Sequence, residues 1–152
     1  MPLKEDFEMH KILVAVDGSE HSERAVRYLI GLIQDGGLLG GSVEVHLVNV
    51  QPLLPTRIAL DMSEDERDRY YGDKSAEDSQ KAEVLLKHEG IAFALHTLQG
   101  DAASQIVACS HSLGCDSIIL GSHGNGFLAG IFLGSVAAKV IQLSDVPITL
   151  VK

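Results

Sequence analysis

Short apolar segments alternate along the chain with turn residues and with segments of helical periodicity. Residues 11–16 are nearly all apolar, which is typical of a strand buried on both faces of a sheet. Comparable segments predict four more strands, at residues 43–50, 91–98, 117–120 and 147–151. Strands that alternate with helices predict a parallel sheet with right-handed crossovers and helices on both faces.

Four helices are predicted between these strands from apolar residues at helical spacing and from capping signals. Ser19 and Asp101 are placed to cap the helices that follow them, and Gly90 is placed to stop a helix at residues 75–88. The last helix is predicted at residues 135–143. The residues expected on the inner faces of the first three helices are Ala25, Leu29, Leu32, Ile33, Ala82, Leu85, Leu86, Ile106, Cys109 and Leu113.

Residues 51–75 form the least regular part of the chain. They hold two prolines and a run of mixed charges at residues 64–69, which is typical of a solvated surface. Ser63 and Glu66 have the spacing of a capping box. This spacing predicts a short helix here, separate from the helix at residues 75–88.

The length and the charge restrict the kinds of partner. A chain of 152 residues with 45% hydrophobic residues is expected to form one domain, residues 1–152. A net charge of −9 repels nucleic acid and anionic membrane surfaces, although local backbone groups can still hold a small nucleotide. Residues 1–10 lack the apolar run of a signal peptide, and residues 127–133 are too short to cross a bilayer. We therefore expect a cytoplasmic protein that binds neither nucleic acid nor membrane.

Cysteine and histidine give no metal-binding pattern. Cys109 and Cys115 form neither a CxxC pair nor a disulfide framework. Cys109 lies on the inner face of its predicted helix and is expected to be buried and inert. Nothing in the sequence marks Cys115 as reactive, and the histidines show no ligand spacing with one another. We expect no metal centre.

A glycine-rich segment, residues 121–136, follows the fourth predicted strand. Glycines allow left-handed backbone angles and a close approach to a ligand, so that their amide groups can line an anion-binding nest. Gly134 and Ser135 open the last helix, which adds free amides, the helix dipole and a hydroxyl. Asp17 and the end of the second strand fall at the same edge of a parallel sheet, where such folds bind ligands. Phosphate is the expected occupant of this loop.

Three better-known motifs fit this segment less well. Gly134 precedes Ser135 at the position where a Walker A loop carries lysine. Residues 124–129 match a loose dinucleotide fingerprint, with Asp145 at about the expected distance, but too few residues follow for the rest of that fold. Ser122 lacks the upstream glycine of a nucleophile elbow, and no general base is identifiable for it.

The glycine spacing resembles the nucleotide-binding signature of the universal stress protein family. The pattern is Gly121-x-x-Gly124, nine residues, and then Gly134-Ser135-Val136. Three further segments are similar to those of family members, and the resemblance covers essentially the whole chain. These segments are Asp17-Gly18-Ser19, Gly100-Asp101-Ala102 and Val146-Pro147-Ile148.

The resemblance implies a three-layer, doubly wound α/β fold with a five-stranded parallel sheet of order 3-2-1-4-5. It also implies ATP or AMP as the ligand, with Mg²⁺ as an accompanying cation. Ala15 and Asp17 would lie beside the nucleoside, and Val48 would offer backbone groups to the adenine. Gly121 and Gly124 would approach the ribose and phosphates. The residues expected to hold the phosphates are Gly134, Ser135 and Val136.

Family members commonly form homodimers through the final strand, here Ile148–Val151. Many also carry arginines in the loop where this sequence has Asn125 and Gly130. The loss of two cations weakens the expected hold on a triphosphate, so AMP or another anion becomes an alternative ligand.

The main hypothesis is a stress-response regulatory protein that binds an adenine nucleotide, with no residue assigned to catalysis. A nucleotide-independent dimeric interaction scaffold is a second reading. A slow ATP-hydrolysing or adenylate-forming enzyme ranks behind both, because no lysine and no convincing general base lie near Gly121.

Overall fold

A parallel sheet of five strands runs through the protein in the computed structural model, which describes residues 9–36, 42–124 and 132–152. The strands lie side by side in the order β3-β2-β1-β4-β5, and every neighbouring pair is parallel. The predicted α/β fold and its strand order are confirmed. The strands are β1 (His10–Ala15), β2 (Val43–Gln51), β3 (Phe93–Gln99), β4 (Ser117–Gly121) and β5 (Ile148–Val151).

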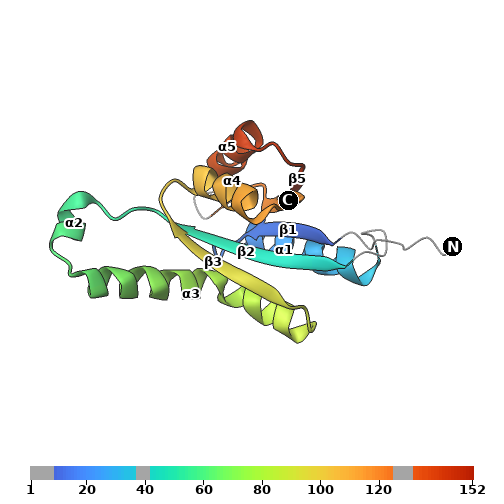
Figure 1. The fold of residues 1–152 in the computed structure, drawn as a ribbon, viewed down its shortest axis with the longest axis horizontal. Coiled ribbons are helices and arrows are strands. Elements are labelled where there is room, and N and C mark those ends of the chain that lie inside the picture. The colour runs from blue at the N-terminus through green and yellow to red at the C-terminus, as the bar shows by residue number, and fades with distance from the viewer. Residues whose placement is uncertain (1–8, 37–41, 125–131) are drawn as a thin grey trace.

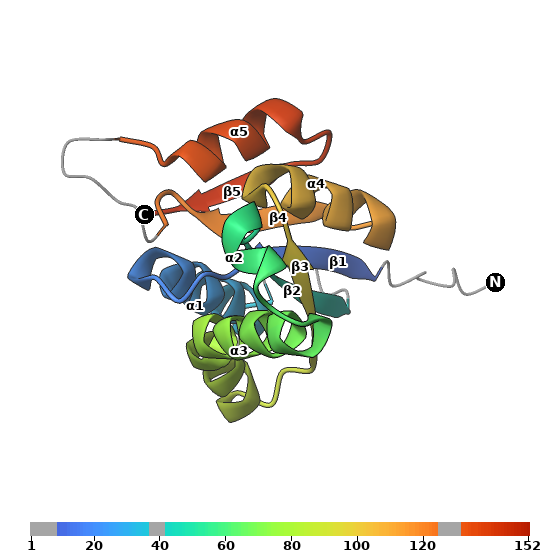
Figure 2. The same cartoon turned by 90° about the vertical axis from the view of Figure 1, so that its left-hand side faces the viewer.

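Helices cover both faces of this sheet, so the fold has three layers (Figures 1 and 2). Helices α1 (Glu20–Gln34) and α3 (Glu64–His88) pack on one face. Helices α4 (Ala102–Leu113) and α5 (Ser135–Leu143) pack on the other. A short helix, α2 (Thr56–Leu60), lies beyond the sheet.

The central strand β1 supplies side chains to both layers of the core. Ile12 and Val14 face α1 and α3, whereas Leu13 faces α4 and α5, and all three are at most 2% exposed. This is why the segment is continuously apolar in the sequence. The predicted inner faces of the helices are confirmed in their central residues, with Leu29 and Leu86 fully buried.

The helix preceding β3 is longer than the sequence predicted. A short helix and a separate helix at residues 75–88 were expected, but α3 is one continuous helix of 25 residues. The capping box of Ser63 and Glu66 is present and starts this helix. Gly72 does not break it, because Tyr71 beside it is buried and accepts a hydrogen bond from the Leu54 amide.

The predicted stop of α3 at Gly90 is confirmed by its φ of +68°, a left-handed angle that glycine adopts without strain. The Ile91 amide still donates to the carbonyl of Leu86 in this closing turn. Strand β3 therefore begins two residues later than the apolar pattern indicated.

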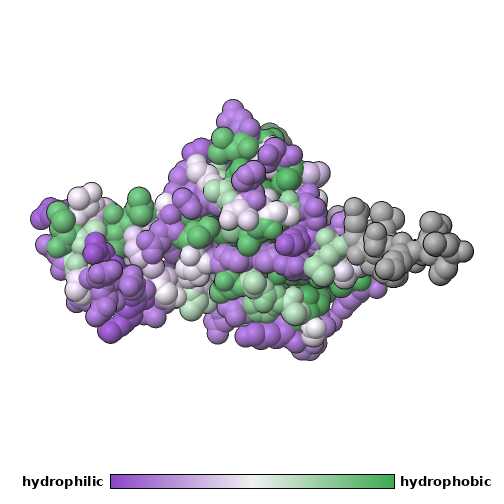
Figure 3. Space-filling model, in the orientation of Figure 1, coloured by the Kyte–Doolittle hydropathy of each residue, from purple (hydrophilic) through white to green (hydrophobic). Residues whose placement is uncertain are grey.

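Residues 55–72, which we call the arm, project past the carboxyl ends of the strands (Figure 1). The arm consists of α2 and the first turns of α3. Apolar and polar surface alternate on this projection (Figure 3), and Ile58 and Leu60 are 49% and 79% exposed. The predicted helix faces did not include this part of the chain.

The connections between the strands decide where the sheet leaves space for a ligand. Strand β1 pairs with β2 on one side and with β4 on the other, so the crossovers after β1 and β3 lead to opposite sides. Neighbouring carboxyl ends then diverge and leave room for a ligand at this edge. The residues gathered there come from the ends of β1, β2 and β4 and from the starts of α4 and α5.

Candidate functional site

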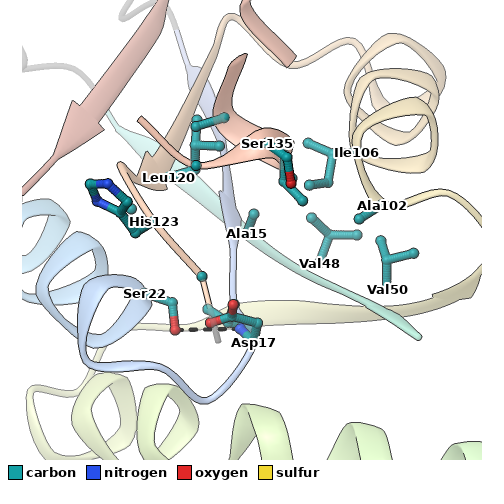
Figure 4. Close-up of a pocket in the computed structure, with 16 residues that line it drawn as sticks. Ala15, Asp17, Ser22, Val48, Val50, Ala102, Ile106, Leu120, His123 and Ser135 are labelled. Atoms are coloured by element: carbon teal, nitrogen blue, oxygen red, sulfur yellow. Dashed lines mark hydrogen bonds between the residues drawn. The ribbon is translucent and has the colours of Figure 1, made fainter. Parts of the chain in front are cut away.

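A pocket of about 420 Å³ lies at the carboxyl edge of the sheet, between the ends of the strands and the starts of α4 and α5 (Figure 4). Every site residue expected from the sequence lines it: Ala15, Asp17, Val48, Gly121, Gly124, Gly134, Ser135 and Val136. The other described residues that line it are Val16, Ser22, Val50, Ala102, Ile106, Leu120, His123 and Ala137.

The apolar half of the pocket is a slot between β2 and the start of α4. Val48, Val50, Ala102 and Ile106 together line this slot (Figure 4). Val50, Ala102 and Ile106 were not predicted from the sequence as ligand residues. The alternation along β2 and the Asp101 cap were signals that could have placed them, because both fix which side chains face this edge.

Asp17 both shapes the turn before α1 and forms part of the pocket wall. Its Oδ1 accepts a hydrogen bond from the Ser19 amide at 3.0 Å, while Ser19 caps α1 by accepting from the Ser22 amide. Gly18 between them has a φ of +78°. The turn thus fixes the carboxylate at the pocket, on the side nearest α3 (Figure 4).

The described motif glycines Gly121, Gly124 and Gly134 have a packing role that was not predicted from the sequence. The described glycines with positive φ are Gly18, Gly36, Gly90, Gly100 and Gly114, so left-handed angles do not explain the loop motif. A Cβ on Gly121 would lie 2.7 Å from Cβ of His21, and one on Gly124 would lie 2.6 Å from Oδ2 of Asp17. One on Gly134 would lie 3.1 Å from the Ser122 carbonyl oxygen. Close packing against His21 therefore excludes a side chain at Gly121, whereas a Cβ on Gly124 would displace the Asp17 carboxylate and one on Gly134 would crowd the Ser122 carbonyl.

Helix α5 points its N-terminus into the pocket. Its N-cap is Gly134, with φ −69° and ψ 157°, a residue that has no side chain with which to cap the first turn. The Gly134 amide donates to the Ser122 carbonyl at 2.7 Å, which holds the helix start against the end of β4. Ser135, Val136 and Ala137 follow, and all three line the pocket. The amides of the first turn and the helix dipole together favour an anion here.

The backbone of β2 limits what Val48 can offer. Pairing of β1 with β2 ends at Ala15 and Val48, and the carbonyl of Val48 accepts the amide of Val16 at 2.9 Å. The carbonyl of Val16 accepts instead from the side-chain amide of Asn49, at 2.8 Å. Val50 therefore lies past the last paired position of β1 and still lines the pocket.

His123 directs its ring away from the apolar slot (Figure 4). Nδ1 of His123 lies 3.0 Å from the Ser122 hydroxyl, and its ring centroid lies 5.1 Å from that of His21 on α1. None of the described pocket residues is lysine or arginine. Asn125 and Gly130, the positions at which relatives carry arginine, lie outside the described residues.

Both thiols are buried outside this pocket, as expected for Cys109. Burial raises the pKa of the Cys109 thiol, and burial together with Cys109 raises the pKa of Cys115 to about 11. Within residues 9–36, 42–124 and 132–152, no three His, Cys, Asp or Glu side chains form a group that could hold a metal ion. No helix in the same ranges is both long and apolar enough to cross a membrane.

Two histidines that sequence spacing did not connect do meet, away from the pocket. The register of β2 and β3 brings Nδ1 of His46 to 2.9 Å from Nε2 of His96. Nε2 of His46 lies 2.7 Å from the Glu44 carboxylate. His46 is buried, and burial followed by the charge of His46 lowers the pKa of His96.

Comparison with known proteins gives consistent matches over nearly the whole chain. The Universal stress protein family model matches residues 8–152. Stress response protein NhaX of Bacillus subtilis is 26% identical over 165 residues, which cover 96% of this chain and 99% of that protein. Universal stress protein MJ0531 of Methanocaldococcus jannaschii is 26% identical over 144 residues, covering 93% and 81%.

Solved structures show the same fold. The hypothetical protein MJ0577 superposes with a TM-score of 0.78 at 28% identity, covering 94% of this chain and 95% of that one. An Archaeoglobus fulgidus universal stress protein, solved in complex with dAMP, gives a TM-score of 0.63 at 22% identity and covers 96% and 99%. A universal stress protein in complex with cAMP gives 0.62 at 19%, covering 94% and 96%. By its family match and its fold, the chain belongs to the universal stress protein family.

Proposed function

We propose that this protein binds an adenine nucleotide in the pocket at the carboxyl edge of the sheet and acts as a nucleotide-responsive stress protein. The observation that carries the proposal is the juxtaposition, in one pocket, of an apolar slot with a helix N-terminus whose N-cap is glycine. A nucleotide has the matching halves, a flat base and an anionic phosphate. The dAMP and cAMP complexes of two related proteins support this choice of ligand.

The base fits the slot between β2 and α4. Val48, Val50, Ala102 and Ile106 give this part of the pocket an aliphatic lining against which a purine can pack. Because pairing with β1 ends at Val48, the backbone of Val50 is the better candidate to hydrogen-bond the edge of the base. Val48 then contributes packing more than hydrogen bonds.

The proposed positions of the ribose and the phosphate follow from the charges around the pocket. The Asp17 carboxylate attracts ribose hydroxyls, which donate, and repels phosphate, which carries only acceptors at neutral pH. The phosphate is therefore placed at the start of α5, where Gly134, Ser135 and Val136 supply amides and a hydroxyl. Gly121 and Gly124 border the space between these two groups.

A monophosphate matches this pocket better than a triphosphate. Its described lining holds no lysine or arginine, and the sequence of residues 125–131 contains neither. On a chain of net charge −9, additional phosphates would meet no lysine or arginine among these residues to neutralise them. We propose AMP as the preferred ligand, with ATP binding dependent on Mg²⁺.

The proposed role is regulatory and has no catalytic residue. An edge strand presents unpaired backbone groups that can add a strand from another molecule. Strand β5 is such an edge, and its Leu150 is 36% exposed. We propose a homodimer through Ile148–Val151 in the cytoplasm. A nucleotide-independent dimeric scaffold is the alternative, because this surface does not need an occupied pocket.

Calorimetry with AMP and with ATP, each with and without Mg²⁺, tests the proposal. Ala102→Leu fills the slot and Ser135→Ala removes the hydroxyl at the start of α5, whereas Ala76→Leu adds the same bulk on the exposed side of α3. We expect AMP to bind the wild type and the Ala76 variant, to lose affinity with Ser135→Ala and to fail with Ala102→Leu.

A folded wild type that binds neither nucleotide would refute nucleotide binding and favour the scaffold. Sedimentation of the wild type, with and without AMP, then shows whether the dimer forms and whether it depends on the ligand. Release of phosphate from bound ATP in a single turnover would instead revive the enzymatic reading.

A further inference from the structure

A hydrogen-bond network of buried side-chain amides lies behind the pocket, on the face of β2 that packs against α3. Nε2 of Gln51 donates to Oδ1 of Asn49 at 2.9 Å and to Oδ2 of Asp78 at 2.7 Å. Nδ2 of Asn49 donates in turn to the carbonyl of Val16 at 2.8 Å. Asn49 is 1% exposed and Gln51 is 7% exposed. Such a buried network holds its geometry, because each broken bond would leave a buried polar group unpaired.

This hydrogen-bond network connects α3 to the end of β1 and to the apolar slot of the pocket. Asn49 and Gln51 alternate along β2 with Val48 and Val50, which face the pocket. The carbonyl of Val16 marks the point at which pairing between β1 and β2 stops. A shift of Asp78 would therefore move the strand end on which the proposed base contacts depend.

Asp78 also supports the opposite wall of the pocket. A Cβ on Gly18 would lie 3.3 Å from both Cα and Oδ1 of Asp78, so the turn that carries Asp17 rests directly on α3. One residue of α3 thus contacts the Asp17 turn and, through Gln51, the end of β2. Neither Asp78 nor Gln51 lines the pocket among the described residues.

We infer that Asp78 is a positioning residue for the nucleotide site, through which α3 and the pocket affect each other. The inference rests on the nucleotide binding proposed above and adds the element that responds to it. One further bond holds α3 to the sheet at this place: the Ser75 hydroxyl lies 2.9 Å from that of Thr97 on β3. Occupancy of the pocket then restrains α3, the helix that carries the arm.

The test measures AMP affinity by calorimetry for the wild type, Asp78→Ala, Gln51→Met and the double variant. Each single substitution breaks the same connection, so we expect each to weaken AMP binding about tenfold. The double variant should bind about as well as either single variant, because residues in one network are not additive. Asp78→Asn keeps an oxygen that can accept from Gln51 and should bind within about threefold of the wild type.

Glu77→Ala is the matched control, since Glu77 is the neighbour of Asp78 on α3 and its side chain is 73% exposed. It should leave AMP affinity unchanged. Hydrogen exchange supplies the second readout: AMP should slow exchange over residues 75–86 in the wild type and not in Gln51→Met, at concentrations that saturate both. Circular dichroism confirms that each variant is folded before titration.

Equal affinities of the wild type, Asp78→Ala and Gln51→Met would overturn the inference while leaving nucleotide binding intact. Additive losses in the double variant, or α3 exchange that AMP does not change, would overturn it as well. A wild type that does not bind AMP would overturn the proposed function itself, which is a separate result of the same titration.

Discussion

The Cα of Gly124 faces the carboxylate of Asp17 so closely that an added Cβ would lie 2.6 Å from Oδ2 of Asp17. The two residues follow the ends of β4 and β1, which are neighbouring strands. The second motif glycine therefore leaves space for an acidic side chain of the protein, and through it for the proposed ribose contact.

Gly124→Ala should therefore weaken AMP binding without unfolding the protein. The new methyl group displaces the Asp17 carboxylate, and misplacing a positioning group by about 1 Å can cost tenfold or more in affinity or rate. Calorimetry measures the effect. Gly72→Ala is the control, because nothing lies within 4 Å of a Cβ at that position. If Gly124→Ala bound AMP with unchanged affinity, the Asp17 carboxylate would not be a contact of the nucleotide.

Gly121→Ala should reduce stability whether or not a ligand is present. Its Cβ would lie 2.7 Å from Cβ and 2.8 Å from the carbonyl carbon of His21, so α1 would have to move. Overpacking of this kind costs about 1–3 kcal/mol in the free energy of unfolding, measured by urea denaturation without nucleotide.

The control for Gly121→Ala is Gly31→Ala in the middle of α1. No atom lies within 4 Å of a Cβ there. Alanine is the better helix former, so this variant should gain about 0.5–1 kcal/mol. If both substitutions changed the free energy of unfolding in the same direction, packing against His21 could not be the reason for glycine at position 121.

The free energy of unfolding should decrease on acidification because His96 becomes protonated. Burial and the nearby His46 lower the pKa of His96 from its ordinary value of 6.5, so protonation is more costly in the folded state than in the unfolded one. The stabilising difference is present above about pH 6.5 and is lost as the pH falls through the lowered pKa. His96→Gln should reduce this loss in denaturation curves between about pH 5 and 8.

His88→Gln serves as the matched control for that measurement, because the His88 side chain is 82% exposed. Its denaturation curves should keep the pH dependence of the wild type. An unaltered pH dependence in His96→Gln would show that protonation of His96 does not contribute to acid sensitivity.

Lys139 should control the ionisation of Asp101 at the start of α4. Hydrogen bonds from Lys139 at 2.8 Å and from Ser104 hold the pKa of Asp101 far below its usual value of 3.8. Lys139→Met should raise this pKa, as seen by NMR titration of the carboxylate. Asp101 would then protonate at a higher pH, and its stabilising interaction would be lost earlier on acidification. Ser104→Ala should give a smaller rise.

The sequence by itself determined the order of elements and most of their ends. Continuous apolar strands, the caps Ser19 and Asp101 and the stop at Gly90 are local signals, because each depends on backbone groups a few residues away. These signals were sufficient to predict the parallel sheet and the residues at its carboxyl edge. The glycine spacing also pointed to this edge, where Gly121, Gly124 and Gly134 line the pocket, but the contacts that these glycines make with the rest of the protein came only from the structure.

Only the tertiary structure decided which distant residues meet. The register of β2 against β3 pairs His46 with Ala94, and so places His46 diagonally opposite His96, where their side chains meet. The register of β2 against β1 commits the Val48 carbonyl to the Val16 amide. Neither contact follows from spacing along one segment. The length of α3 was also decided this way, because burial of Tyr71 outweighs the weak helix propensity of Gly72. Contacts between separate elements depend on the whole packing, and a local pattern carries no record of them.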